Sequence, residues 1–391
     1  MKTSNYRNPH ERRMKVDVLT LAKWVISASD RAHPADGVLR AELKTQRDLS
    51  PDERTRVSAA VFAFFRWRGW LNPEKPVSDQ IEAALAIAER YARQPESFSD
   101  ADLVARAAPG WVASVMDVSA DWARALQAHP KLWLRARRGQ GKTLAVKLGD
   151  CRICGKGAMA DTVEYRGRQD LFRTVEFHAG EFELQDISSQ AVGLICGPRP
   201  GETWWDASAG EGGKMLHLSE LMENKGLIWA SDPAAWRLQR LKRRAARARV
   251  FNYRTAGWDG GPKLPTKTKF DGVLIDAPCS GIGTWQRNPH ARWTATAEDV
   301  KELSEVQKRI LANAAAAVKP GGKLIYAVCT FTRAETIDVA EAFEKRFPEF
   351  ERLLMGNPLD PDAPARARVE YWPQHFGGSG MFIAGWLRRP A

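Results

Sequence analysis

The sequence lacks three features that would each mark a class of protein. Its 391 residues include only five cysteines, an odd number at irregular spacing, which argues against a disulfide framework. No apolar run approaches the ~20 residues that a membrane span needs. The opening stretch, MKTSNYRNPHERRMKV, has no apolar core of the kind found in export signals. We therefore expect a cytoplasmic protein without membrane contact.

Acidic residues are also in the minority. The chain has 59 Lys and Arg against 47 Asp and Glu, which gives a formal net charge of +12. Excess cations release counterions from phosphate groups, so a nucleic acid is the expected partner. A basic protein with no polyanionic partner is the alternative that charge alone leaves open.

The pattern of apolar and polar residues changes twice along the chain, which predicts three structural segments. Residues 1–128 read as amphipathic helices, one of which opens with a capping box at residues 50–53. Residues 129–182 contain short alternating runs (LWLRARR, TLAVKLG, FRTVEFH) that predict strands of a small α+β connector. In residues 183–391, short apolar runs such as TWWD and FDGVLIDAP alternate with helical patterns. That alternation is typical of a parallel sheet covered by helices on both faces.

A glycine-rich loop follows the first strand of this sheet, in WWDASAGEGGKM. Gly210, Gly212 and Gly213 would let backbone amides approach a ligand closely. The next strand ends on Asp232, at the point where an acid typically accepts hydrogen bonds from ribose hydroxyls. Asp259, after the third strand, is placed to meet an adenine amino group. Taken singly, these features could be tight turns, and their spacing does not distinguish a dinucleotide from S-adenosylmethionine.

Two cysteines stand at the ends of the fourth and fifth strands. Cys279 lies in DAPCSG and Cys329 in YAVCT. A single buried thiol is usually a core residue. If the two strands are neighbours, however, both thiols face one cleft at the carboxyl edge of the sheet.

Paired thiols suit methylation of cytosine at C5. A thiolate that adds to C6 turns the ring into a nucleophile, and a base must later remove the C5 proton. One cysteine can add while the other assists release, but spacing does not select which. Methylation of an exocyclic amine needs no thiol.

The other three cysteines carry no such implication. Cys151 and Cys154 have the spacing of half a zinc site, but no second pair matches them. We therefore expect no metal, and we expect Cys196 to be a core residue.

At these motifs the sequence resembles the RsmB/NSUN family of S-adenosylmethionine-dependent RNA 5-methylcytosine methyltransferases. DASAGEGGKM resembles the family's cofactor loop, and its D-A-P-C-S-G stands unchanged at residues 276–281. VCTFTRAET resembles its T-C-S segment, with Glu335 at the acidic position. LQDISSQAV and YWPQHFGGSGMFIA resemble two further family segments. The chain departs from the pattern at Ser208, Glu211, Thr330 and Ser379.

The resemblance implies a fold and a set of roles. The fold is α/β, a Rossmann-like class I methyltransferase domain with a mostly parallel seven-stranded sheet, preceded by an all-α NusB-like RNA-binding domain and the connector. Cys329 would be the nucleophile and Cys279 the residue that releases the product, while Asp276 would position cytosine or cofactor. S-adenosylmethionine would be held by Ser208, Ala209, Gly210, Glu211, Gly212, Gly213, Lys214, Asp232, Arg237, Asp259 and Asp276.

The substrate implied by the resemblance to the RsmB branch is small-subunit rRNA. Transfer RNA is an alternative, as is a non-catalytic RNA-binding role in ribosome assembly. Arg287 and Arg292 flank the thiol loop and are candidates for phosphate contact, whereas the basic stretch 237–249 could equally be a solvated helix face. The target cytosine must be unstacked to expose C6. We expect a monomer.

Overall fold

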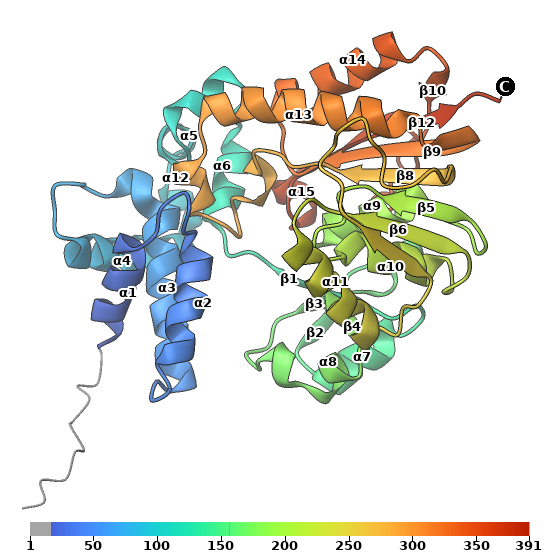
Figure 1. Cartoon of the computed structure of the whole chain (residues 1–391). Helices are drawn as coiled ribbons and strands as arrows, with labels where there is room; N and C mark the ends of the chain where they lie inside the picture. The colour runs from blue at the N-terminus through green and yellow to red at the C-terminus, as the bar shows by residue number, and fades with distance from the viewer. Residues whose placement is uncertain (1–16, 156, 391) are drawn as a thin grey trace, which may run out of the picture. The chain divides into compact units, whose positions relative to one another are not determined.

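The computed structural model describes residues 17–155 and 157–390, which pack into two compact units that meet in the chain at Phe98 and Ser99 (Figure 1). The expectation that no export signal is present rests on residues 1–16, which lie outside the described residues. Within the described ranges, none of the helices combines the length and the apolar character that crossing a bilayer requires.

The first unit is helical. Ser50 caps α3, because its Oγ accepts from the amide of Glu53 at 3.2 Å while a Glu53 carboxyl oxygen accepts from the Ser50 amide at 2.8 Å. Buried Trp67 at the end of α3 packs against the rings of Tyr91 and Phe98. The helices fit the expected NusB-like region. Their bounds are α1 (Val18–Ser27), α2 (Ala35–Thr45), α3 (Pro51–Trp67) and α4 (Val77–Arg93).

The second unit opens with two helices and a small antiparallel sheet in the order β2-β3-β1-β4. The small sheet and the helices beside it have an α+β arrangement. The elements of this part of the chain are α5 (Asp100–Arg106), α6 (Ala120–Gln127), β1 (Leu132–Ala136), α7 (Gly141–Leu148), β2 (Cys151–Ile153), β3 (Thr162–Tyr165), α8 (Val175–His178) and β4 (Phe182–Leu184).

Two of the three strands predicted in the connector are wrong. TLAVKLG forms α7, in which Leu144 is buried and Val146 is 84% exposed, so its apolar residues follow helical rather than alternating spacing. FRTVEFH forms a turn and α8, because Thr174 caps the helix by accepting from the amide of Phe177. Of the three predicted runs, only LWLRARR forms a strand, which is β1.

The large sheet has eight strands rather than the seven expected: its order is β10-β12-β9-β8-β5-β6-β7, and the additional strand β11 pairs with β12 beside that path. The strands from β9 to β7 run parallel, and β12 is antiparallel to β9, which confirms the Rossmann-like fold. The strand bounds are β5 (Thr203–Asp206), β6 (Leu227–Ser231), β7 (Tyr253–Ala256), β8 (Phe270–Asp276), β9 (Val318–Val328), β10 (Phe350–Arg352), β11 (Arg368–Tyr371) and β12 (Met381–Arg388).

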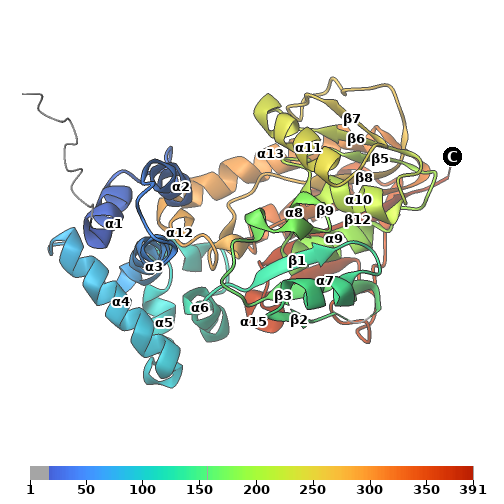
Figure 2. The same ribbon diagram turned by 90° about the horizontal axis from the view of Figure 1, so that it is seen from below.

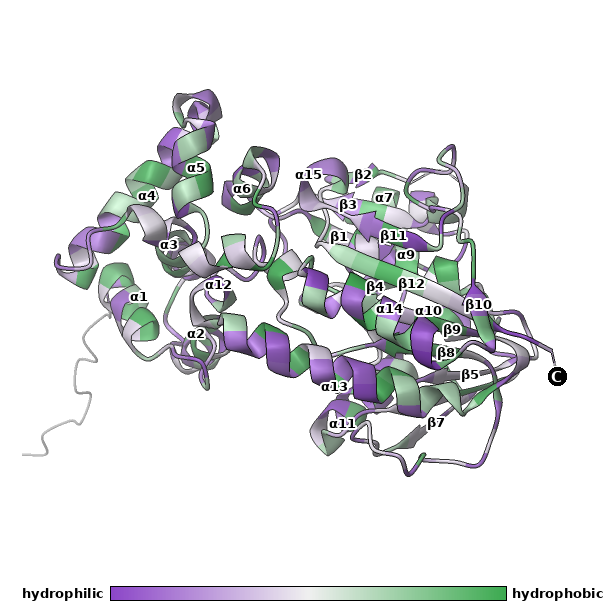
Figure 3. Ribbon diagram, turned by 90° about the horizontal axis from the view of Figure 1, so that it is seen from above, coloured by the Kyte–Doolittle hydropathy of each residue, from purple (hydrophilic) through white to green (hydrophobic). Residues whose placement is uncertain are grey.

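Helices cover both faces of this sheet (Figures 1 and 2). One apolar core includes residues of α9, α10 and α11, and the other includes residues of α13 and α14. In Figure 3, α13 alternates hydrophobic and hydrophilic bands, as expected for a helix with one buried face. The helices are α9 (Ile187–Cys196), α10 (Gly213–Leu221), α11 (Ala235–Arg247), α12 (Ala291–Thr294), α13 (Ala297–Ala315), α14 (Ile337–Arg346) and α15 (Pro373–Phe376).

The order in which strands are added to the sheet reverses between β5 and β8. From β5 the sheet grows through β6 to β7 on one side, and then through β8 and β9 on the other. In open parallel sheets, ligands bind outside the carboxyl ends of the strands at such a reversal. A ligand site is therefore expected among the loops that follow β5, β6, β8 and β9.

Candidate active site

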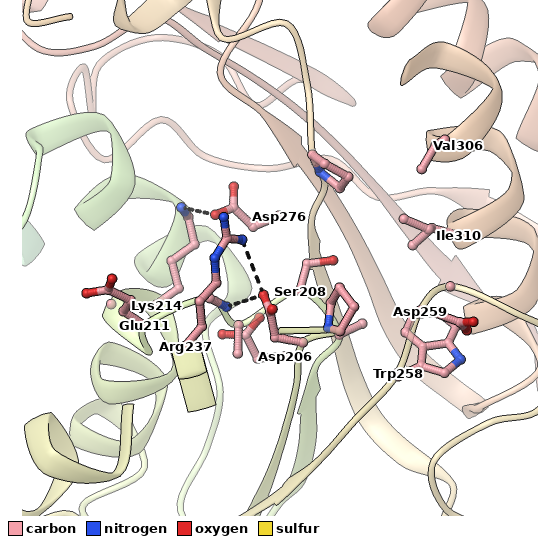
Figure 4. A pocket seen from close by; sticks show the side chains of 18 of the residues that line it. Asp206, Ser208, Glu211, Lys214, Arg237, Trp258, Asp259, Asp276, Val306 and Ile310 are labelled. Atoms are coloured by element: carbon pink, nitrogen blue, oxygen red, sulfur yellow. Dashed lines mark hydrogen bonds and ion pairs between the residues drawn. The ribbon is translucent and has the colours of Figure 1, made fainter. Parts of the chain in front are cut away.

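A cavity of about 450 Å³ lies at this edge, which is within the size range of small-molecule sites. Its wall includes nearly all the residues predicted to hold a cofactor (Figure 4). Those residues are Ser208, Ala209, Gly210, Glu211, Gly213, Lys214, Asp232, Arg237, Asp259 and Asp276.

Gly212 is the one predicted contact that does not line the cavity. It caps α10 in the left-handed region, at φ +88°, and a Cβ there would lie 2.7 Å from Leu241. Gly210 is also left-handed, at φ +54°. The loop thus needs glycine at Gly212 to let α10 pack against α11.

Asp232 connects the glycine loop to the end of β6. Its carboxylate is 3% exposed and accepts from the amides of Gly210 at 3.2 Å and Ala234 at 2.8 Å. Arg237 lies 3.6 Å from the same carboxylate. Asp259 accepts from the amide of Gly261 at 2.9 Å, which shapes the turn after β7. Both acids are therefore held in place by backbone amides and still line the cavity.

Lys214 and Asp276 form an ion pair across the cavity, with Nζ and Oδ2 2.7 Å apart (Figure 4). Burial alone would lower the pKa of Lys214, but Asp276 and then Asp206 outweigh it, and the pKa is raised. The ammonium therefore carries its charge into a buried site, where it also acts on Cys329.

Asp206, at the end of β5, is a lining residue that the sequence reasoning missed. It is 1% exposed, and neither carboxyl oxygen accepts a well-aligned hydrogen bond among the described residues. Burial, followed by the nearby Asp276 charge, raises its pKa to about 7, against the opposing effects of Lys214 and the neighbouring Ser208 amide. Its position at the end of the strand, directly before the glycine loop, is the sequence signal that points to it.

The apolar part of the wall was also missed. Trp258 follows β7, Pro278 precedes the thiol, and Val306 and Ile310 come from α13 (Figure 4). The α13 pair has ordinary helical spacing, so nothing in the sequence separates it from residues of the core.

The two cysteines meet because β8 and β9 are parallel neighbours. Their sulfur atoms lie 3.2 Å apart. The hydrogen bond with Cys279 lowers the pKa of Cys329, and the cations Arg287 and Lys214 lower it further, against burial and the negative Asp276. The same hydrogen bond, burial and the negative Glu335 raise the pKa of Cys279. Cys329 is therefore the more acidic thiol, and the thiolate is the reactive form.

Glu335 is fully buried and connects the two thiol loops. Its carboxyl group accepts from the amide and hydroxyl of Ser280 at 2.8 and 2.6 Å, beside Cys279. It also accepts from the hydroxyl of Thr330 at 3.2 Å, beside Cys329. Thr332 and, from α13, Gln307 donate to it as well. One side chain thus fixes the residues that follow both cysteines.

The two arginines predicted to contact phosphate differ in their environments. Arg287 is exposed, and its Nε donates to the hydroxyl of Ser379 at 3.0 Å. Arg292 is fully buried, and its guanidinium donates to the carbonyl oxygens of Ala107, Leu126 and Trp285. The prediction of phosphate contact is therefore wrong for Arg292, because its donors already serve the main chain. The sequence shows charge but not burial.

A family model described as 16S rRNA methyltransferase RsmB/F matches residues 194–387. The probable ribosomal RNA small subunit methyltransferase B of Bacillus subtilis is 33% identical over 248 residues, which are 60% of this chain and 54% of that protein. The matching protein of Synechocystis is 35% identical, over 53% of this chain and 48% of its own length. The chain thus spans about half the length of these two relatives. Ribosomal RNA small subunit methyltransferase B of Xylella fastidiosa (strain Temecula1) is 31% identical, over 78% of this chain and 71% of its own length.

Two solved structures are also similar. The crystal structure of PH0851 aligns with a TM-score of 0.76 at 20% identity and covers 95% of this chain and 97% of that one, which shows a shared fold. NSun6 from Pyrococcus horikoshii, solved with SFG, aligns with a TM-score of 0.50 at 25% identity over 57% of each chain.

Proposed function

Because the chain belongs to the RsmB/F family of 16S rRNA methyltransferases, we propose that it methylates C5 of a cytosine in small-subunit rRNA, with S-adenosylmethionine as the methyl donor. One observation carries this proposal. The sulfur atoms of Cys279 and Cys329 lie 3.2 Å apart, and the cations that act on Cys329 include Lys214 of the adjoining cavity. Two thiols beside a nucleoside-sized cavity are what C5 chemistry requires.

The cavity residues fit S-adenosylmethionine, which supplies an electrophilic methyl group. Asp206 has a buried carboxyl group without a well-aligned hydrogen bond, which suits the ammonium of the methionyl part. Asp232 can accept from the ribose and Asp259 from the adenine amino group, with Trp258 and Ile310 beside the base. SFG, found with the Pyrococcus NSun6, is an analogue of this cofactor.

We assign attack on the base to Cys329. Its thiolate would form a bond to C6, and the electrons of the C5–C6 double bond would form the new bond from C5 to the methyl group, while the bond from the methyl to the donor's sulfur breaks and a neutral thioether leaves. A base then takes the C5 proton, the double bond is restored, and the Cys329 thiolate leaves. We assign the removal of the C5 proton, which lets Cys329 leave, to Cys279, whose sulfur lies 3.2 Å from that of Cys329 and which must first have given up its own proton. Arg287, exposed beside the thiols, would bind a flanking phosphate.

The domain organisation is also part of the proposal. We propose that residues 1–128 form an RNA-binding domain and that residues 183–391 carry out methyl transfer. Residues 129–182 would form the connector between these two domains. The compact units divide at Phe98, and α5 and α6 belong to the second unit. That the protein is a monomer stays a prediction.

Transfer of tritiated methyl groups tests the activity. The purified protein is incubated with labelled S-adenosylmethionine and, separately, with transcribed 16S rRNA, assembled small subunits and bulk tRNA. We expect label in small-subunit RNA, located at one cytosine by bisulfite sequencing, and none with Cys329→Ala. Label in tRNA alone would contradict the rRNA assignment. RNA binding without any transfer would instead favour a non-catalytic assembly factor.

A further inference from the structure

An aromatic and basic surface lies at the rim of the large sheet, away from the cofactor cavity. Strand β7 ends the strand order, so its outer edge has no partner strand among the described residues (Figure 2). A shallow hollow of about 630 Å³ extends along it and over α11. We call it the β7-edge surface, and its residues are Trp229, Lys242, Ala246, Val250, Phe251, Tyr253, Arg254 and Thr255.

The aromatic side chains of this surface are exposed or half-buried, so they can stack with a ligand instead of packing in the core. Phe251 is 76% exposed, although it follows directly on the buried Val250. Trp229 and Tyr253 are half-buried, and the Arg254 guanidinium lies 5.9 Å from the centre of the Trp229 ring. An exposed phenyl ring beside half-buried aromatic rings and arginine is the combination on which unpaired bases stack.

The charge of this part of the chain has one sign. Residues 233–258 contain eight Lys and Arg and no Asp or Glu. Four of these cations, on α11, have carboxylate partners: Arg237 with Asp232, Arg240 with Glu211, and Arg244 and Arg247 with Glu183. Lys242 and Arg254, which line the hollow, have no ion pair within the described residues. The β7-edge surface therefore presents free positive charge next to the exposed ring.

We propose that the β7-edge surface binds an unpaired segment of the substrate RNA, with a base stacked on Phe251 and phosphates held by Lys242 and Arg254. This rests on the proposed function and adds a second contact to it. Free cations and an exposed ring complement a polyanion with stacking bases, whereas an added protein strand would need only the backbone edge.

The spacing of the sheet lets one RNA reach both sites. Strand β7 lies four positions from β9, which carries Cys329 at its end. At ~4.8 Å per strand this is about 19 Å across the sheet. The register aligns Tyr253 with Lys323, so Cys329 also lies about eight residues, or ~26 Å, further along the strand direction than Phe251. The two offsets together give about 32 Å, which nucleotides spaced by ~3.4 Å cover in about ten steps. An RNA element with an unpaired flank can therefore place its cytosine at the thiols and stack a flanking base at the edge.

The test compares two triple variants that lose the same charge. The test variant is Lys242→Gln/Phe251→Ala/Arg254→Gln. The control, Arg309→Gln/Lys345→Gln/Leu354→Ala, removes two exposed cations and one exposed apolar side chain elsewhere. Binding of fluorescent 16S rRNA fragments is followed by anisotropy at several salt concentrations, together with cofactor binding and the melting temperature.

We expect the test variant to bind RNA at least roughly tenfold more weakly, since one stacking contact is lost. Its salt slope should fall by about 1.4, which corresponds to two phosphate contacts on a single strand. Cofactor affinity and melting temperature should match the control.

Equal RNA binding by both variants would overturn the proposal. So would weaker binding of the test variant to assembled small subunits only, which would indicate a protein partner at this surface. Because binding is measured directly, the result stands even if the wild-type protein transfers no methyl group.

Discussion

At the scale of single residues, Asp206 shows how a binding site can weaken a fold. A buried carboxyl group without a well-aligned hydrogen bond destabilises the cofactor-free protein. Its pKa of about 7 lies above the ~3.9 of an unfolded chain. Protonated Asp206 therefore makes its full contribution to folding stability below pH ~4. This contribution is lost as the pH rises towards 7, because ionisation then favours the unfolded state.

Asp206→Asn should therefore raise the melting temperature of the cofactor-free protein, and by more at pH 8 than at pH 5. It should weaken S-adenosylmethionine binding by roughly tenfold, since a charge-assisted hydrogen bond is lost. Thermal unfolding and calorimetric titration measure the two effects. Equal gains in melting temperature at both pH values, with unchanged affinity, would exclude this role.

Asp271→Asn is the matched control at the other end of β8. Burial raises the pKa of Asp271, but its hydrogen bonds from Lys319 and the Thr203 amide lower it overall. That stability is present at neutral pH and is lost as pH falls through the lowered pKa. Asp271→Asn should thus lower the melting temperature at pH 8 and leave cofactor affinity unchanged.

At the scale of elements, Glu335 couples two strand ends to one helix. Its carboxyl group accepts from donors on the loop after β8, on the loop after β9 and on α13. The approach of the two thiols thus depends on a group that touches neither of them directly. Glu335 is a positioning residue in this account.

Glu335→Gln should slow methyl transfer by ~10- to 100-fold, because the new amide faces donors and the thiol loops lose their common acceptor. Cofactor affinity should stay within about twofold, since Glu335 does not line the cavity. Glu341→Gln, on the exposed face of α14, serves as the control. A full transfer rate in the Glu335 variant, measured with saturating RNA, would rule out this coupling.

The elements also show what the sequence could and could not predict. The strands of the large sheet, its glycine loop and the neighbouring thiols follow from apolar runs that end at Asp206, Asp276 and Val328. The connector helix α7 was missed because Leu144, Val146 and Leu148 also alternate like a strand. Burial of Arg292 could not be predicted, because its partners, such as Ala107 and Leu126, are remote in sequence.

At the scale of the whole molecule, the excess of cations is unevenly distributed. Several arginines of α11 pair with acids, and Arg292 is buried among carbonyl oxygens. Within the described residues, the cations left without an acidic partner include Arg287 at the thiol loop and Lys242 and Arg254 on the β7-edge surface. Net charge alone indicated a polyanionic partner, whereas only the fold separates structural cations from those available to it.

The most direct test of the central claim is a search for the covalent protein–RNA intermediate. Cys279→Ala and Cys329→Ala proteins are each incubated with S-adenosylmethionine and 16S rRNA, denatured in detergent and separated by electrophoresis. Cys279→Ala should accumulate a slowly migrating, nuclease-sensitive adduct, because Cys329 attacks and its release is blocked. Cys329→Ala should form none. An adduct in the Cys329 variant alone would exchange the two roles, and its absence from both would contradict catalysis through a cysteine bond to the base.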